Sequence, residues 1–190
     1  MASPITAAIA LAVRLYRGAW WKLCLSLVLA GSIAACNQTE REIAPEALNS
    51  FYSDEQPAIS GNGRIIAFVS NRAGKRQIRA YDLQRSRFID LSGLNQRDTI
   101  PQHPSLSQTG RYLVYLAAER RGRPEIRLYD RLTRRSRVLM DSDRGVMHHP
   151  SISPDGRYIV FESGESGQWD IKAIDRGANI ELDRPDGATD

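Results

Sequence analysis

The chain has 190 residues, of which 42% are hydrophobic and 25% are charged, and its formal net charge is +4. These values are typical of a globular protein and exclude an intrinsically disordered chain. The length leaves room for one ordinary domain with a packed core.

Residues 1–35 differ in composition from the rest of the chain. They contain Arg14, Arg17 and Lys22, no acidic residue, and then an apolar run of 13 residues at 23–35. A basic segment followed by an apolar run too short to span a bilayer predicts an export signal peptide. Its removal would leave 23 basic and 22 acidic residues, a formal charge of +1. The positive charge of the whole chain is therefore no indication of nucleic-acid binding, and we expect none.

The apolar run ends in Ile33-Ala34-Ala35-Cys36, which resembles the lipobox of bacterial lipoproteins. This resemblance implies cleavage between Ala35 and Cys36, lipidation of Cys36, and a periplasm-facing protein anchored in the bacterial envelope, in the inner or the outer membrane. The alternatives are an uncleaved N-terminal anchor helix, or ordinary cleavage that leaves Cys36 as a free thiol. Because Cys24 would leave with the signal peptide, the mature chain could form no intramolecular disulfide.

A repeat of 46 to 47 residues occupies 54–190, after a polar linker at 36–53. Three turn glycines and three prolines each recur at intervals of 47 and 46 residues: Gly63, Gly110 and Gly156, and Pro57, Pro104 and Pro150. A fixed period of this length indicates a repeat architecture. We place the three repeats at about 54–101, 102–147 and 148–190.

Each repeat predicts four short strands. They are 57–60, 64–70, 77–82 and 87–91 in the first repeat, 104–107, 111–117, 125–130 and 137–140 in the second, and 150–153, 157–163, 170–175 and 179–182 in the third. Four strands per period with hairpin connections are typical of one propeller blade. The predicted fold class is therefore all-β, a partial β-propeller with three four-stranded blades.

The turn between the first two strands carries the clearest local signal. In the third repeat Pro154 presets the first central φ, Asp155 tolerates the second position, and Gly156 accepts the left-handed conformation needed to leave the turn. Asn62-Gly63 serves the same purpose in the first repeat, and Thr109-Gly110 is the weakest version.

The strands that follow predict how the blades pack. In the third repeat, Tyr158 and Val160 face one way and Ile159 and Phe161 the other, so both faces are apolar and need a cover, as in sheets stacked around an axis. The strand at 125–130 instead alternates Ile126 and Leu128 with Arg127 and Tyr129, which predicts one half-exposed face.

The pattern Pro-x-x-Ser-Pro-Asp-Gly, an apolar strand ending in Phe-x-Ser, and a later Ile-x-x-x-Asp resembles the TolB-type β-propeller repeat. The resemblance implies a non-enzymatic docking surface in the envelope, a protein partner, and a role in envelope integrity or biopolymer transport. The chain has no room for the α/β domain that precedes the propeller in the namesake, so membership of a Tol system does not follow.

Propellers usually close with about 4 to 8 blades, so three blades leave two flanks open. The domain begins with a segment of the innermost-strand type, 56–60, and ends without one. This predicts that the segment 56–60 belongs to no complete blade of its own and that the last blade lacks one strand. The simplest closure is then a homodimer in which each chain donates its strand near Ile59 to the other's last blade. The alternatives are an open or distorted three-blade monomer, a ring completed by another protein, and a shortened gene product.

Two histidines are candidates for a site at the mouth of the propeller channel. His103 and His149 share one repeat position, with His148 adjacent and Gln56 at that position in the first repeat. No carboxylate or thiolate near them in the sequence completes a ligand set, so we expect hydrogen-bonded histidines and no metal or cofactor. The rival functional hypothesis is a ligand- or metal-binding accessory or sensor subunit that uses this channel.

Two further features have plain structural interpretations. The stretch 119–137 holds eight arginines against three acids. It could bind anionic headgroups or an acidic partner, and the preferred interpretation is that the arginine stems shield outer strands. Ser60, Ser107 and Ser153 recur before the turns without the Gly-x-Ser-x-Gly pattern of a nucleophile, so we predict no enzymatic activity.

Overall fold

The computed structural model of the chain describes residues 47–119, 123–142 and 146–185. These residues form eleven strands. The strands are β1 (Asp54–Ile59), β2 (Ile65–Ser70), β3 (Gln77–Asp82), β4 (Arg87–Ile89), β5 (Thr99–Leu106), β6 (Tyr112–Glu119), β7 (Pro124–Asp130), β8 (Arg135–Asp141), β9 (Met147–Ile152), β10 (Tyr158–Ser163) and β11 (Asp170–Asp175). The signal peptide and most of the linker predicted from the sequence lie outside the described residues.

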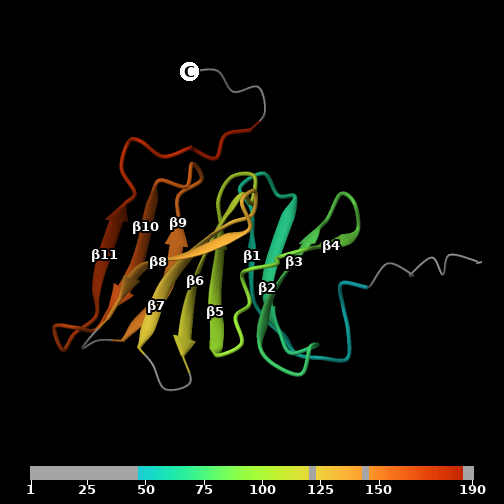
Figure 1. Cartoon of the computed structure of the whole chain (residues 1–190), viewed down its shortest axis with the longest axis horizontal. Coiled ribbons are helices and arrows are strands. Elements are labelled where there is room, and N and C mark those ends of the chain that lie inside the picture. The colour runs from blue at the N-terminus through green and yellow to red at the C-terminus, as the bar shows by residue number, and fades with distance from the viewer. Residues whose placement is uncertain (1–46, 120–122, 143–145, 186–190) are drawn as a thin grey trace, which may run out of the picture. The chain divides into compact units, whose positions relative to one another are not determined.

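The strands form three antiparallel sheets, which we call blades 1 to 3 (Figure 1). Blade 1 has the order β1-β2-β3-β4, blade 2 the order β5-β6-β7-β8, and blade 3 the order β9-β10-β11. The first strands of successive blades contact one another, β1 with β5 and β5 with β9, so they form the inner edge of the array. The predicted all-β fold, a partial propeller of three blades, is confirmed.

Two expectations about the ends of the array are wrong. The first segment does not lack a blade, because β1 pairs with β2, with Ile59 opposite Ile66. The segment 179–182 forms no strand. Instead the C-terminal segment, residues 176–185, leaves β11 and bonds to blade 2, where the Tyr112 hydroxyl donates to the Glu181 carbonyl at 2.5 Å. The missing strand of the last blade is therefore its outermost one.

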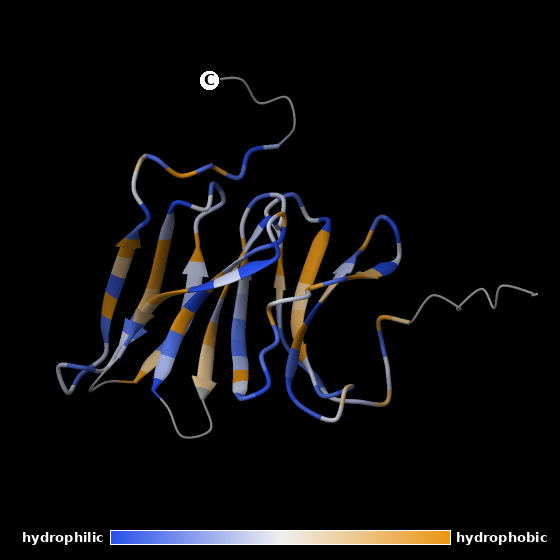
Figure 2. Cartoon of the chain, in the orientation of Figure 1, coloured by the Kyte–Doolittle hydropathy of each residue, from blue (hydrophilic) through white to orange (hydrophobic). Residues whose placement is uncertain are grey.

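The core lies between the blades. One cluster joins blades 1 and 2, and a second joins blades 2 and 3. Strand β6 supplies both, because Leu113 and Tyr115 face blade 1 while Val114 and Leu116 face blade 3. Figure 2 shows the difference between a covered strand such as β2, which is largely hydrophobic, and β11, where hydrophobic and hydrophilic residues alternate.

Strand β7 is less exposed than its sequence indicates. The expected half-exposed face is wrong, because the Tyr129 side chain is fully buried in the cluster between blades 1 and 2 and its hydroxyl donates to the Ser92 carbonyl at 2.8 Å. Arg127 is also buried, and its guanidinium donates to Glu125 at 2.6 Å and to Gln96 at 2.7 Å. Buried polar ends require such partners.

The turns between the first and second strands share a hydrogen-bond pattern. In the first turn Ser60 Oγ accepts the Ile65 N–H at 2.9 Å and donates to Asn62 Oδ1 at 2.7 Å. The third turn repeats this arrangement with Ser153 and Asp155. The serines at these positions therefore hold the turn together.

The second turn has no carboxylate or amide two residues after its serine, and a carboxylate from the C-terminal segment takes that place. Thr109 stands where the other turns have Asn62 or Asp155, and the Asp183 carboxylate accepts hydrogen bonds from Ser107 Oγ at 2.5 Å, from Thr109 N–H at 2.7 Å and from Thr109 Oγ1 at 2.5 Å. The Asp183 N–H donates to the Asp155 carbonyl at 2.8 Å. The C-terminal segment therefore joins the turns of blades 2 and 3.

Each blade also contains one arginine–aspartate pair at the same place, where the second strand begins and the third ends. The pairs and their N–O distances are Arg64–Asp82 at 2.7 Å, Arg111–Asp130 at 3.4 Å and Arg157–Asp175 at 2.8 Å. Hydrogen bonds from Arg64 lower the pKa of Asp82 to about 2, and hydrogen bonds from Arg157 lower the pKa of Asp175 to about 2. Both aspartates are therefore charged at neutral pH.

The turn glycines provide a test of the contact between blades 2 and 3. Gly156 and Gly63 have φ of 80° and 71°, so alanine is strained at either position by about 1–2 kcal/mol. An added Cβ at Gly156 would lie 2.5 Å from Tyr112 Cδ2 in blade 2, whereas nothing lies within 4 Å at Gly63. We predict that Gly156→Ala lowers the free energy of unfolding by roughly 1–3 kcal/mol more than Gly63→Ala, measured by chemical denaturation. Equal losses would contradict the packing.

The role of Asp183 is testable by rescue. Asp183→Ala leaves the N–H and Oγ1 of Thr109 without their acceptor and leaves Ser107 Oγ only the Tyr112 carbonyl at 3.2 Å, so it should lower the free energy of unfolding by roughly 2–4 kcal/mol. Adding Thr109→Asn should recover part of this loss, because the first turn uses Asn62 in the same way. The exposed Asp98→Ala is the control and should change stability by less than about 0.5 kcal/mol. If the double variant is no more stable than Asp183→Ala, the proposed substitution of one acceptor for another is wrong.

Candidate functional site

Blade 3 presents an exposed face whose equivalents in the other blades are buried. Ile78 in blade 1 and Ile126 in blade 2 are 1% and 0% exposed, because each faces the next blade. The equivalent residue in blade 3, Ile171, is 74% exposed. The residue is therefore placed for contact with a further sheet that the described part of the chain does not supply.

Neighbouring residues extend this exposed surface. Tyr158 and Val160 of β10 are 44% and 42% exposed, and Ala173 of β11 is exposed beside Ile171. Val160 lies opposite Ala173 in the antiparallel register. We call Tyr158, Val160, Ile171 and Ala173 the free face of blade 3. Among the described residues, β11 pairs only with β10, so its outer edge also offers backbone donors and acceptors.

The opposite end of the array is partly covered by its own side chains. On the outward side of blade 1, the Phe88 ring lies 6.3 Å from the Phe68 ring and 5.0 Å from the Tyr81 ring. The Arg79 guanidinium lies 4.2 Å and the Arg72 guanidinium 5.2 Å from the Phe88 ring centre. These cations stack on aromatic faces and cover part of this side of blade 1, while Ile59 on the same side is 57% exposed.

The inner edge carries a repeated backbone feature. Gln56, His103 and His149 have φ of 54°, 49° and 47°, and each lies where the pairing of the first two strands of its blade shifts. Non-glycine residues seldom adopt this conformation, and it marks a bulge here. The Gln56 side chain accepts the His103 N–H at 2.8 Å. The structure thus places both predicted histidines at the inner edge, with ring centres 4.4 Å apart.

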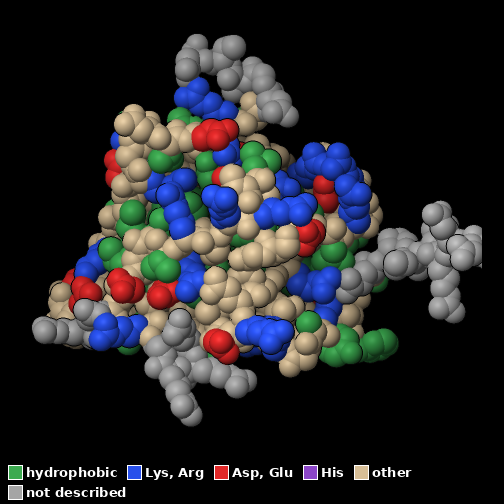
Figure 3. Space-filling model, in the orientation of Figure 1, with side chains coloured by type: hydrophobic (Ala, Val, Ile, Leu, Met, Phe, Trp, Pro, Cys, Tyr) green, Lys and Arg blue, Asp and Glu red, His purple; other side chains and the backbone are tan. Residues whose placement is uncertain are grey.

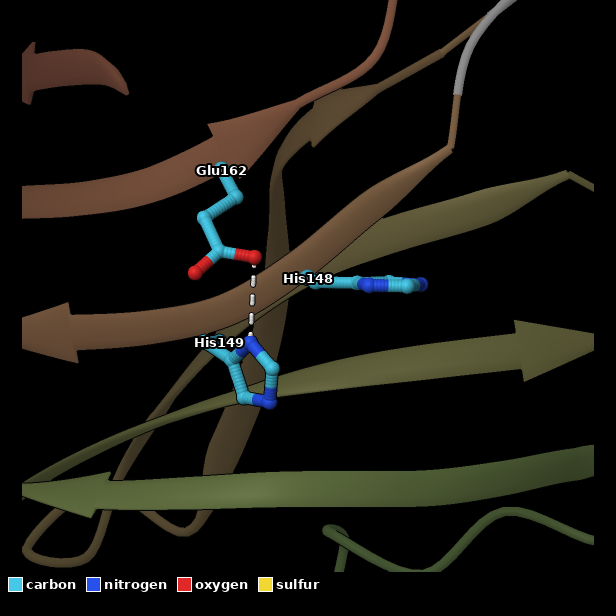
Figure 4. Close-up of side chains that lie close together, drawn as sticks. All are labelled: His148, His149 and Glu162. Atoms are coloured by element: carbon cyan, nitrogen blue, oxygen red, sulfur yellow. Dashed lines mark hydrogen bonds and ion pairs between the residues drawn. The ribbon is translucent and has the colours of Figure 1, made fainter. Parts of the chain in front are cut away.

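A carboxylate that the sequence analysis did not find lies beside these histidines (Figure 4). Glu162 of β10 points towards β9, and its Oε2 lies 3.1 Å from Nδ1 of His149. Ligand atoms of His148, His149 and Glu162 all lie within 4.8 Å of one another. The expectation that no nearby carboxylate completes a ligand set is therefore wrong. The available signal was that Glu162 replaces apolar residues, Val69 and Leu116, at its position in the repeat.

The surroundings of the cluster restrict its rings. The His148 ring lies 4.8 Å from the Trp169 ring at an interplanar angle of 30°. The pKa of His103 is lowered, first by burial and then by the proximity of His149 and His148. His103 is therefore favoured in its neutral form, as a packing partner of His149.

A groove of about 770 Å³ lies beside the turns and the C-terminal segment. Its lining includes Arg64 with Asp82 and Arg111 with Glu181, whose charged atoms lie 2.7 Å and 2.6 Å apart. The pKa of Glu181 is lowered by its hydrogen bond with Arg111. These two pairs neutralise their own charges, and the lining also includes Arg85, Arg87 and Arg131.

In the arginine-rich stretch, Arg127 and Arg131 serve the fold, whereas the other described arginines, Arg123, Arg134, Arg135 and Arg137, are exposed. Arg131 donates to the carbonyls of Gly110 at 2.9 Å and Thr109 at 3.4 Å. Burial lowers the pKa of Arg131. In Figure 3, Lys and Arg side chains are spread over the visible face with Asp and Glu between them.

The predicted lipidation residue Cys36 and cleavage residue Ala35 lie outside the described residues. Across the described part of the chain, no helix has the length and apolar character that crossing a membrane requires.

Solved structures that superpose on this chain include two TolB proteins. TolB from Acinetobacter baumannii superposes with a TM-score of 0.58 and 24% identity, over 72% of this chain and 33% of that one. A protein designated TolB from Agrobacterium tumefaciens superposes with a TM-score of 0.55 and 21% identity, over 72% of this chain and 48% of that one. A chain of the nidogen–laminin complex superposes with a TM-score of 0.50 and 12% identity, over 69% of this chain and 51% of that one.

These similarities concern the fold. The chain spans about a third to a half of the length of the solved structures it matches. No family model matches the chain, and no curated protein matches it. The strand order, the packing of the blades and the similarity to these structures together show that the described residues have a TolB-like β-propeller fold.

Proposed function

We propose that the chain is a non-enzymatic, lipid-anchored protein of the bacterial envelope that binds another envelope protein through the free face of blade 3. The observation that carries this proposal is the contrast at one repeat position, where Ile78 and Ile126 are buried between blades and Ile171 is 74% exposed. Contiguous exposed apolar residues rimmed by polar ones mark interaction sites. The TolB-like fold supports the envelope location.

The partner we propose presents a sheet of its own. The free face of blade 3 has the alternation that packs against a blade elsewhere in this chain, and the outer edge of β11 can extend a sheet by backbone pairing. A second copy is a weaker candidate, since Phe88, Arg72 and Arg79 already cover part of the outward side of blade 1. We therefore propose a different envelope protein as the partner.

We also propose that the chain has no enzymatic activity. The Oγ atoms of Ser60, Ser107 and Ser153 each accept a backbone N–H within their turns. This arrangement leaves them as structural hydroxyls rather than nucleophiles.

A photo-crosslinking amino acid placed at residue 171 tests the docking face. In cells of a bacterium that produces the full chain, irradiation should yield a protein adduct at this position. The same amino acid at Leu132, which is exposed in blade 2, is the matched control and should yield little.

The mass of the adduct identifies the class of partner. A mass equal to two copies of the chain would replace the proposed partner by a homodimer. If position 171 gives no more adduct than position 132, the free face of blade 3 is not a docking site and the proposed function is wrong.

Metabolic labelling with radioactive palmitate tests the tether. We predict that the wild-type chain is labelled and that Cys36→Ser is not, because the thioether to the lipid requires a thiol. Two or three acyl chains would hold the protein on a membrane, since each buried methylene contributes about 0.8 kcal/mol. Cys24→Ser is the control and should remain labelled, whereas continued labelling of Cys36→Ser would exclude this anchor.

A further inference from the structure

We propose that His148, His149 and Glu162 form a binding site for a divalent transition-metal ion of the Zn²⁺ type. Their ligand atoms lie within 4.8 Å of one another at the inner end of blade 3 (Figure 4). The proposal goes beyond docking by the free face and does not depend on it.

The bulge in β9 explains how two consecutive histidines reach one carboxylate. In a regular strand, His148 and His149 would project from opposite faces of the sheet. The left-handed conformation of His149, with φ of 47°, interrupts this alternation between the residues that pair with Val160 and Glu162. His148 lies opposite Glu162 in the register, and His149 reaches the same carboxylate through Nδ1.

The ligand types match the chemistry of the ion. Imidazole nitrogen suits Zn²⁺, Cu²⁺ and Ni²⁺, and two histidines with one glutamate leave a fourth position of a tetrahedral Zn²⁺ site open. Bonds of about 2.0–2.2 Å place the ligand atoms roughly 3.3–3.5 Å apart around the ion. Glu162 and His149 are already 3.1 Å apart. His149 is exposed and the other two residues are half-buried, so an ion can reach the cluster from solvent.

The repeat shows that blade 3 is specialised at these positions. The equivalents of His148, His149 and Glu162 are Glu55, Gln56 and Val69 in blade 1, and Gln102, His103 and Leu116 in blade 2. Val69 and Leu116 are buried apolar residues between blades. A carboxylate has therefore replaced an apolar side chain in the one repeat that has two adjacent histidines at these positions.

Neighbouring aromatic rings hold the ligands in position. Trp169 packs along the His148 ring at 4.8 Å, and His103 packs edge-on against His149 at 4.4 Å. Such contacts restrict the rotation of ligands and reduce the entropy lost on binding.

The test is a Co²⁺ titration of the full chain, purified in detergent without a polyhistidine tag and stripped of metal with a chelator. We expect one equivalent of Co²⁺ to give a visible absorption band, Zn²⁺ to displace it with a Kd of about 10 µM or tighter, and Zn²⁺ to raise the melting temperature. His149→Ala and Glu162→Gln should each weaken binding at least about 10-fold.

Glu165→Gln is the matched control, because Glu165 lies in the adjacent loop and pairs with Lys172. It should bind Co²⁺ as the wild type does. An absence of binding at millimolar Zn²⁺ would overturn the proposal, as would equal binding by wild type, His149→Ala and Glu162→Gln. A near-ultraviolet thiolate-to-cobalt band would place the ion on Cys24 or Cys36 and would also overturn it. Circular dichroism of each variant separates loss of binding from loss of folding.

Discussion

Every part of this structure depends on apolar packing between neighbouring blades. A strand such as β6 is apolar on both faces, so it is stable only when one blade covers each side. Blade 2 meets this condition within the chain. Blade 1 meets it in part, because Phe88 and two arginines fold over its outward side, and blade 3 meets it on one side only. The same packing rule that stabilises the array thus leaves one surface available for a partner.

The sequence predicted the elements whose signals are local. The glycine turns and the strands that follow them were found because Gly63, Gly110 and Gly156 impose a backbone conformation and each strand has a two-residue alternation. The prediction of a strand at 179–182 was wrong for a related reason. Its composition allows a strand, but Asp183 and Glu181 have stronger hydrogen-bond partners on blade 2 than on the edge of β11.

The candidate sites show the same limit of local signals. The sequence placed His103 and His149 at one repeat position, but the approach of Glu162 depends on the register of β9 and β10 and on a bulge between them. The burial of Tyr129 likewise depends on a carbonyl, that of Ser92, supplied by the preceding blade. Contacts of this kind become visible only when the strands are placed in space.

The hydrogen bonds of Asp183 have a consequence for the order in which the protein is completed. Ribosomes produce the chain from its N-terminus, so the second turn leaves the ribosome more than seventy residues before the carboxylate that accepts its hydrogen bonds. Blade 2 therefore cannot reach its final stability during synthesis of its own residues. A chain that ended before residue 183 would contain every strand of blade 2 and still lack the carboxylate that completes its turn.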